Sequence, residues 1–237
     1  MSEKVAPDCD TACFLATARD DSTRAALADP SVFGALPQEA GAGVFLRVDT
    51  PLPKRKPDGS HLQTLPAPFD ALILLRGPLA GCLDQLGAFL DNAGPLLDPE
   101  HSALFAGPEY IIKPADLPVL VVMLAVRKPD DDRTSFQHRW LHGHAPFGLR
   151  MPAPGYSQIH FQDIRPDAGL PPSLLTASGF DGLATVSYAS RADVARLRAT
   201  PEIALQATTD EMEFIDHARS MLMMFERPGT VSRATRI

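Results

Sequence analysis

Apolar and polar positions divide this chain into short segments that follow the same order twice. The first half is expected to run strand, helix, strand, strand, helix, strand, at Cys13–Ala18, Ser22–Phe33, Gly43–Thr50, Phe69–Arg76, Leu79–Asp91 and Glu109–Lys113. The second half repeats this order at Val119–Arg127, Thr134–His144, Tyr156–Ile164, Gly182–Tyr188, Arg191–Ala199 and Met221–Glu226. Pro146 and Pro201 are expected to stop the two helices that precede them. A βαββαβ order is that of the ferredoxin-like unit, so the pattern predicts an α+β fold.

The two halves superpose at a constant offset of 111 residues, which places Phe69-Asp70-Ala71-Leu72 on Phe180-Asp181-Gly182-Leu183. Strands and helices stay in phase across this offset, which indicates a tandem duplication. We therefore predict two domains, residues 1–115 and 116–237. A ferredoxin-like sheet carries its helices on one face and must bury the other. Two such units can pack their bare faces together within one chain as a pseudo-dimeric α+β barrel.

Composition narrows the classes of function. The chain has 237 residues and a formal net charge of −7, which disfavours nucleic acid as a partner. The basic run Lys54-Arg55-Lys56 is short, lies among prolines and is expected to be a solvated loop. The polar N-terminus shows no signal peptide, and no apolar run reaches the roughly 18 residues of a membrane span. With three cysteines and no paired motif, a reducing cytoplasm is the expected compartment.

The segment Phe136–Ile164 carries most of the candidate chemistry, with four of the seven histidines and the single tryptophan. Helical spacing places Phe136, Trp140 and His144 on one face, where the first two are expected to pack in the core. His138 and His142 share another face. They lack a third ligand, so we expect surface histidines and no metal site.

The strand that follows adds polar side chains in alternation. Tyr156, Gln158, His160 and Gln162 share one face, and Ile159 and Phe161 share the other. If the apolar pair lies beneath the helices, the polar face points into the barrel interior. Buried polar groups need partners or a purpose, so they either line a ligand cavity or hydrogen-bond among themselves.

These motifs resemble the EthD family of the dimeric α+β barrel superfamily. The resemblance rests on Trp140-Leu141-His142-Gly143-His144-Ala145-Pro146, on Pro154-Gly155-Tyr156, on Phe180-Asp181-Gly182-Leu183, and on Thr209-Asp210-Glu211 with Phe214-Ile215-Asp216. It covers about Pro118–Pro228. It implies the barrel fold and, among relatives, cofactor-free monooxygenases, polyketide cyclases and dehydratases. The histidine that matches the signature is His144, with Trp140 as its aromatic partner.

The expected function is therefore a cofactor-independent enzyme, an oxidoreductase or a lyase, acting on a small apolar or aromatic molecule. His144 is the candidate general base, and Trp140, Tyr156, Gln158 and His160 are the candidate substrate-binding residues. Two alternatives stay open. One is an accessory protein that binds a hydrophobic ligand without chemistry, and the other is a filled barrel with no cavity. Exposed sheet edges could also pair two chains into a homodimer.

The first half lacks a matching cluster. The offset places Ala25, Asp29 and Asp49 where the second half has Phe136, Trp140 and His160. We therefore expect one functional pocket in the chain.

Overall fold

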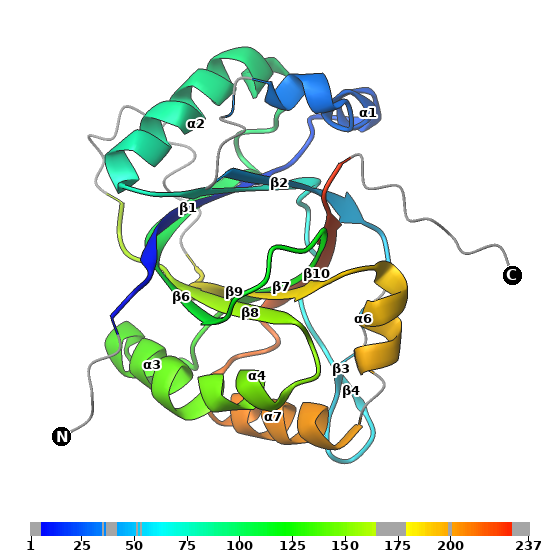
Figure 1. Cartoon of the computed structure of the whole chain (residues 1–237), viewed down its shortest axis with the longest axis vertical. Helices are drawn as coiled ribbons and strands as arrows, with labels where there is room; N and C mark the ends of the chain where they lie inside the picture. The colour runs from blue at the N-terminus through cyan, green and yellow to red at the C-terminus, as the bar shows by residue number, and fades with distance from the viewer. Residues whose placement is uncertain are drawn as a thin grey trace, which may run out of the picture.

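The computed structural model describes residues 6–34, 36, 42–50, 52, 54–164, 179–198 and 201–228. Its centre is a closed antiparallel barrel of eight strands, in the order β1-β5-β2-β10-β7-β9-β8-β6. Helices α1 and α2 cover one side of the barrel, and α3, α4, α6 and α7 cover the opposite side (Figure 1).

The elements follow the predicted alternation with additions. The first half consists of β1 (Cys9–Ala16), α1 (Asp21–Leu27), η1 (Pro30–Phe33), β2 (Ala42–Val48), β3 (Lys54–Arg55), β4 (His61–Leu62), β5 (Ala71–Arg76), α2 (Leu79–Ala93), η2 (Gly94–Leu96) and β6 (Ala103–Lys113). The second consists of β7 (Val119–Ala125), α3 (Arg133–Arg139), η3 (Trp140–His144), α4 (Ala145–Arg150), β8 (Gly155–His160), β9 (Gly182–Tyr188), α6 (Arg191–Arg198), α7 (Pro201–Phe214) and β10 (Met221–Glu226).

Strands of the two halves are arranged alike. The first half has the order β2-β5-β1-β6 and the second the order β8-β9-β7-β10. Two seams join them, because β10 pairs with β2 and β6 pairs with β8. Every barrel strand therefore has two hydrogen-bonded neighbours, and the barrel has no free edge.

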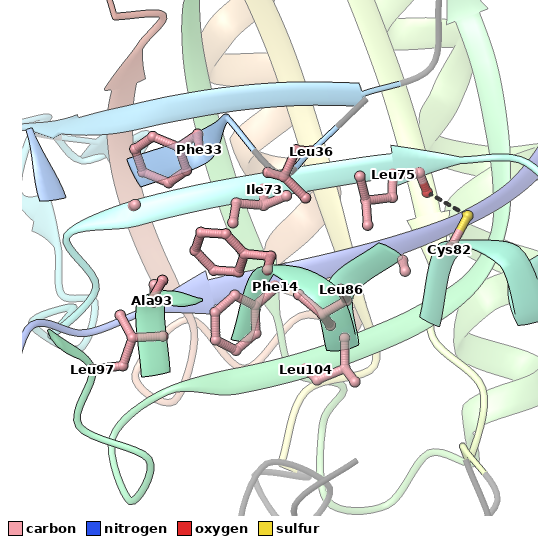
Figure 2. Close-up of a cluster of buried hydrophobic side chains, with 14 of the residues drawn as sticks. Phe14, Phe33, Leu36, Ile73, Leu75, Cys82, Leu86, Ala93, Leu97 and Leu104 are labelled. Carbon is pink, nitrogen blue, oxygen red and sulfur yellow. Dashed lines mark hydrogen bonds between the residues drawn. The ribbon is translucent and has the colours of Figure 1, made fainter. Parts of the chain in front are cut away.

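Apolar side chains fill the barrel interior. Every second residue of each strand points inward, so both halves contribute to one cluster that includes Leu72, Phe105, Leu124, Ile159 and Phe225. A second cluster, which includes Phe14, Ile73 and Leu86, lies on the outer face of the first half under α2 (Figure 2). In it, Phe14 and Phe89 meet edge to face. Burial of these two layers supplies the main driving force for folding.

One polar cluster interrupts the apolar interior near the end of β6. Glu109 is fully buried and accepts hydrogen bonds from Thr11 at 2.8 Å, Ser157 at 2.8 Å and Arg76 Nε at 2.6 Å. Burial alone would raise the pKa of Glu109, but the Arg76 guanidinium outweighs it and holds the pKa below its ordinary value. The ion pair lies within the first half, and the hydrogen bond from Ser157 of β8 links it to the second half inside the barrel.

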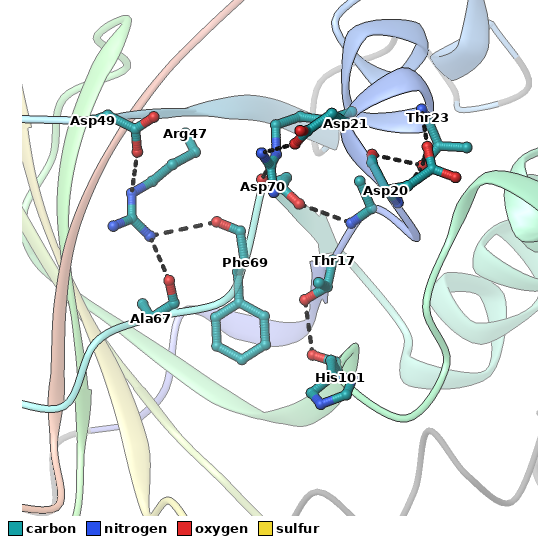
Figure 3. A network of polar contacts seen from close by, with 12 residues as sticks. Thr17, Asp20, Asp21, Thr23, Arg47, Asp49, Ala67, Phe69, Asp70 and His101 are labelled. Atoms are coloured by element: carbon teal, nitrogen blue, oxygen red, sulfur yellow. Dashed lines mark hydrogen bonds and ion pairs between the residues drawn. The ribbon is translucent and has the colours of Figure 1, made fainter.

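An aspartate that precedes the third strand has the same role in both halves. Asp70 accepts hydrogen bonds from the backbone of Ala18, at 2.8 Å, and from Arg24 of α1, at 2.7 Å (Figure 3). Asp181 accepts from the backbone of Arg127, at 2.8 Å, and from the side chain of Arg133 of α3, at 3.2 Å. Each carboxylate thus fixes the loop between the first strand and the first helix of its half.

Three helical predictions were wrong in part. The helix predicted over Ser22–Phe33 ends at Leu27, because Pro30 starts a separate 3₁₀ turn capped by Asp29. Pro146 does not end the helix before it. A π-helical turn over Trp140–His144 ends with the Ala145 N–H bonded to the Trp140 carbonyl, and Pro146 then occupies the first turn of α4, where no intrahelical donor is needed.

The third difference concerns α7. Pro201 was expected only to stop a helix, yet it begins the 14-residue helix α7. Proline is favoured in the first turn of a helix because its fixed φ suits that position. This unpredicted helix carries two carboxylates of the site described below.

In the part of the chain that the structure describes, no helix is both long enough and apolar enough to cross a membrane.

Candidate functional site

A cavity of about 630 Å³ lies between the outer face of the second-half sheet and the elements that cover it. Strands β7, β9 and β10 form its floor. Its walls come from η3, α6 and α7, from the segment Met151–Ala153 after α4, and from β3 of the first half. The floor is apolar and is lined by Val121, Met123, Ala184, Val186, Leu222 and Met224. A volume of this size suits a small organic ligand.

His144 is a polar group in the wall of this cavity, held at the end of the π-helical turn. Its Nδ1 lies 2.9 Å from Oδ2 of Asp210, and its Nε2 lies 3.5 Å from Oε1 of Glu211. An ionised carboxylate only accepts hydrogen bonds, so Asp210 places the proton of a neutral imidazole on Nδ1. Its Nε2 then faces Oε1 of Glu211, at a separation at the limit of a hydrogen bond. π-helical turns of this kind are frequent at functional sites.

Glu211 connects His144 with two further side chains. One oxygen forms an ion pair with Lys54 of β3 and lies 3.4 Å from Nε2 of His217. Burial would raise the pKa of Glu211, but the charge of Lys54, with the nearby imidazoles, outweighs burial and lowers it. Glu211 is therefore an ionised carboxylate at neutral pH, despite being buried.

His217 is buried beside Glu211 and contributes no charge near pH 7. Burial lowers its pKa to about 4, and the positive charge of Lys54 acts in the same direction. Neither of its ring nitrogens has a hydrogen-bond partner in the described part of the structure. It lies next to the carboxylate rather than in the cavity wall.

Strand β8 presents its polar face to the helices, which corrects the prediction that this face lines the barrel interior. Ile159 and Phe161 belong to the barrel interior instead. The barrel is filled from both halves by apolar side chains, so the polar residues of β8 are left to pair with groups under η3 and α4. The predicted cavity exists, but it lies outside the barrel.

Those polar residues form a chain of hydrogen bonds that ends at the cavity. His160 Nε2 lies 3.1 Å from Oε1 of Gln158, and Gln158 Nε2 donates to the Tyr156 hydroxyl at 2.6 Å and to the Trp140 carbonyl at 3.2 Å. Because the Tyr156 oxygen accepts from Gln158, its own proton is free to be donated. Burial raises the pKa of the Tyr156 phenol, so the group stays neutral.

The structure brings three of the five predicted site residues to the cavity wall. Trp140, His144 and Tyr156 line it, whereas Gln158 and His160 lie behind them. His160 stacks on Trp140, with ring centroids 5.4 Å apart and planes 5° apart. Gly148 and Gly182 allow the close fit, since a Cβ on either residue would lie 2.1 Å from the Tyr156 ring or 2.4 Å from the Trp140 ring.

Two packing predictions for the histidine segment are confirmed, the exposure of His138 and His142 and the burial of Phe136. His138 and His142 are exposed, with rings 4.5 Å apart. Phe136 packs in the core against Trp140. Across the described ranges, no group of three His, Cys, Asp or Glu side chains could hold a metal ion.

Three side chains of the site were not predicted as such. Asp210 and Glu211 lie in α7, where the sequence motif Thr209-Asp210-Glu211 was noted only for its family resemblance. Lys54 was expected in a solvated loop, but its side chain is only 15% exposed and pairs with Glu211. The proline-rich surroundings of Lys54 gave no signal of this contact, which joins residues 157 positions apart.

Solved structures that resemble this chain share its fold. An anthrone oxidase-like protein matches with a TM-score of 0.58 and 10% identity, over 92% of this chain and 91% of that one. A dye-decolorizing peroxidase from Bacteroides thetaiotaomicron matches with a TM-score of 0.53 and 10% identity, over 94% and 96%. A DypB variant from Rhodococcus jostii RHA1 matches with a TM-score of 0.55 and 10% identity, over 94% of each chain. No curated protein sequence matches.

The closed antiparallel barrel with helices on its outer faces is thus of the dimeric α+β barrel type. Within it, residues 128–218 match the EthD domain family. The matched stretch holds Trp140, His144, Tyr156, Asp210 and Glu211.

Proposed function

We propose that this protein is an enzyme that removes a proton from a small, largely apolar aromatic or carbonyl compound, with His144 as the general base. The observation that carries the proposal is the position of His144 at the wall of an apolar cavity, between two carboxylates. An imidazole that takes up a proton becomes a cation. Asp210 and Glu211 are placed to stabilise that cation, and a positioned base of this kind contributes roughly two to four orders of magnitude in rate.

Tyr156 would stabilise the negative charge that develops on the substrate. Tyr156 lines the same cavity, and its hydroxyl has a proton to donate, because Gln158 already occupies its oxygen as a donor. A hydrogen bond to an enolate or phenolate oxygen in an apolar cavity is stronger than in water. The chemistry needs these side chains alone, so we propose a reaction without a cofactor.

Anthrone is a suitable first probe, since one solved neighbour is described as anthrone oxidase-like. Its methylene carbon loses a proton to a base, and the resulting carbanion is conjugated with the carbonyl oxygen. Reaction of that carbanion with O₂ would convert anthrone and O₂ into anthraquinone and water. The same proton removal, followed by loss of a neighbouring hydroxyl group as water, would instead give a dehydration. Attack of the carbanion on a carbonyl carbon of the same molecule, with protonation of its oxygen, would give a cyclisation.

The test separates the proton transfer from the oxygenation. Exchange of the anthrone methylene hydrogens in D₂O is followed without oxygen, and O₂ uptake is followed in air. We expect His144→Ala to slow both by at least about 10²-fold and His138→Ala, which removes an exposed histidine, to leave both unchanged. Equal rates for wild-type protein and the His144 variant would contradict the proposal.

An accessory role in ligand binding is the second candidate, and the mostly apolar lining of the cavity supports it. The protein would bind a hydrophobic molecule and release it unchanged. Titration of the Trp140 fluorescence with the same probe distinguishes the two roles. Saturable quenching without any proton exchange would favour binding alone.

We also infer that the chain is a tandem of two ferredoxin-like units with a boundary near Ala115. The equal strand orders of the two halves and the matched roles of Asp70 and Asp181 support this inference. Expression of residues 1–115 and 116–237 as separate chains that reassemble on mixing would test the boundary. Pairing of two whole chains into a homodimer remains a prediction, for which native mass measurement is the direct experiment.

A further inference from the structure

The hairpin formed by β3 and β4 belongs to the first half in sequence but packs on the second half. It lies between β2 and β5 along the chain, and β3 contacts α7 of the EthD domain. Figure 1 shows the hairpin beside α6 and α7, far from α1 and α2 of its own half. The first half therefore reaches the side of the second-half sheet that lines the cavity.

The contact at the end of this hairpin is a buried ion pair. The side chains of Lys54 and Glu211 are 15% and 9% exposed, and His144 on the other side of Glu211 is 8% exposed. Burying two charges costs roughly as much desolvation free energy as their attraction returns, so such pairs contribute little to stability. A role in the chemistry of the neighbouring His144 explains the pair better.

We propose that Lys54 is a positioning residue of this site, whose ammonium group holds Glu211 as a carboxylate beside His144. The proposal rests on the proposed function of His144. It implies that the EthD domain does not contain its complete site, because one charged side chain comes from the first half.

The charges around Glu211 support this assignment. Lys54 comes from β3, His144 from η3, Asp210 from α7 itself and His217 from the segment after α7. Beyond these, Arg139 lies 3.4 Å from Asp210, and the Tyr156 phenol is neutral. The negative charge of Asp216 opposes the lowering of the His217 pKa. His217 is uncharged near pH 7, so the permanent positive charge next to Glu211 is that of Lys54.

Removal of the Lys54 charge raises the pH at which this site takes up a proton, whether Glu211 or His144 responds. Without Lys54, Glu211 either takes up a proton itself or pairs more strongly with a protonated His144. In both cases a proton is held more tightly, so the basic form of His144 beside an ionised Glu211 appears only at higher pH. A charge about 4 Å away shifts a titration by about three pH units at an effective dielectric constant of about 20, so we expect a shift of at least about one pH unit when Lys54 is removed.

The experiment compares Lys54→Met with Lys54→Arg and with Lys56→Met, which removes the same charge two residues further along the hairpin. We expect the acid limb of the kcat profile for anthrone to move up by at least about one pH unit in Lys54→Met, with KM little changed. Lys54→Arg keeps the charge and should restore the wild-type limb, and Lys56→Met should leave it in place. Thermal unfolding of each variant establishes that it is folded.

A second readout does not depend on turnover. In protein with labelled histidines, the titration of the His144 ring signals should shift in Lys54→Met. The shift is to higher pH if Glu211 stays ionised, and to lower pH, as in Glu211→Gln, if Glu211 takes up the proton. The Glu211 variant also tests the linkage if Lys54→Met does not fold. Unchanged His144 titration in folded Lys54→Met, alongside loss of turnover in His144→Ala, would overturn the role of Lys54 and leave the proposed function intact. A shifted titration with full turnover in His144→Ala would instead overturn the proposed function.

Discussion

Gly182 of β9 lies directly against the ring of Trp140, so closely that a Cβ on this glycine would be 2.4 Å from ring atom Cζ3. It would also be 2.7 Å from the carbonyl oxygen of Ile159. Neither neighbour can move easily, since one is a fully buried ring and the other is sheet backbone. The absence of a side chain at Gly182 thus sets the depth at which Trp140 sits beside the cavity.

Gly182→Ala should lower the free energy of unfolding by about 1–3 kcal/mol, the usual cost of overpacking. Trp140 is the single tryptophan of the chain, so its emission reports the displacement directly. Chemical unfolding and fluorescence spectra measure both effects. Gly87→Ala in α2 is the matched control, because no atom lies within 4 Å of its Cβ. That control should stabilise the helix by about 0.5–1 kcal/mol, and an unperturbed Gly182→Ala would contradict the close fit.

Glu109→Gln should destabilise the barrel, because it leaves Arg76 without its carboxylate. Loss of one partner of a buried pair costs roughly 3–5 kcal/mol, and the lower end applies since the Arg76 side chain is 35% exposed. The pKa of Glu109 is lowered in the folded state, so its contribution is complete above the ordinary carboxyl pKa and is lost as pH falls through the folded value. Urea unfolding at pH 7 and at pH 3 measures this, with the exposed Glu100→Gln as control. The variant should be less sensitive to acid than the wild type.

His160 should make the protein less stable as pH falls from about 6.5 to 4. Burial lowers its pKa to about 4, so the unfolded chain binds a proton in this interval while the folded chain does not. At about 1.4 kcal/mol per pH unit the loss is of the order of 3 kcal/mol at pH 4. In His160→Gln this part of the pH dependence should disappear, while the similarly buried His217 retains its own. His138→Gln should keep the wild-type slope, and a parallel slope for His160→Gln would show that His160 is already protonated when folded.

Asp210→Asn should reduce proton exchange with anthrone without unfolding the protein. An amide can present its NH₂ to Nδ1 and so favour the wrong tautomer of His144, an effect that costs up to about 10⁴-fold in a serine protease triad. We expect a loss of at least about 10²-fold, with little change in the thermal midpoint. Asp163→Asn, at an exposed aspartate paired with Arg133, is the control. If Asp210→Asn retained full activity, Asp210 would not orient the base.

Sequence periodicity predicted the barrel strands well, because strands buried on both faces carry continuous apolar runs such as Val119–Ala125. It could not tell which face of β8 points inward. Both faces of this strand are buried, so Tyr156 and Ile159 gave no contrast between core and solvent. The assignment depends on the other strands that fill the barrel, which is a property of the whole fold.

The site itself was predictable only where its residues are close in sequence. Trp140, His144 and Tyr156 belong to one segment with an unusual concentration of rings. Lys54 meets Glu211 because the hairpin of β3 and β4, in a proline-rich stretch, extends to α7, which starts at Pro201. Neither the course of the hairpin nor the start of that helix follows from local propensity. Proline was interpreted as a stop at both Pro146 and Pro201, although it is equally at home in a first helical turn.

The two strand seams, β2 with β10 and β6 with β8, determine how the site responds to dilution. Since both seams join parts of one polypeptide, closure of the barrel is a unimolecular event whose equilibrium is independent of protein concentration. Dilution therefore cannot separate the hairpin that carries Lys54 from the helix that carries Glu211. A barrel assembled from two separate chains would instead lose such a shared site below its dissociation constant.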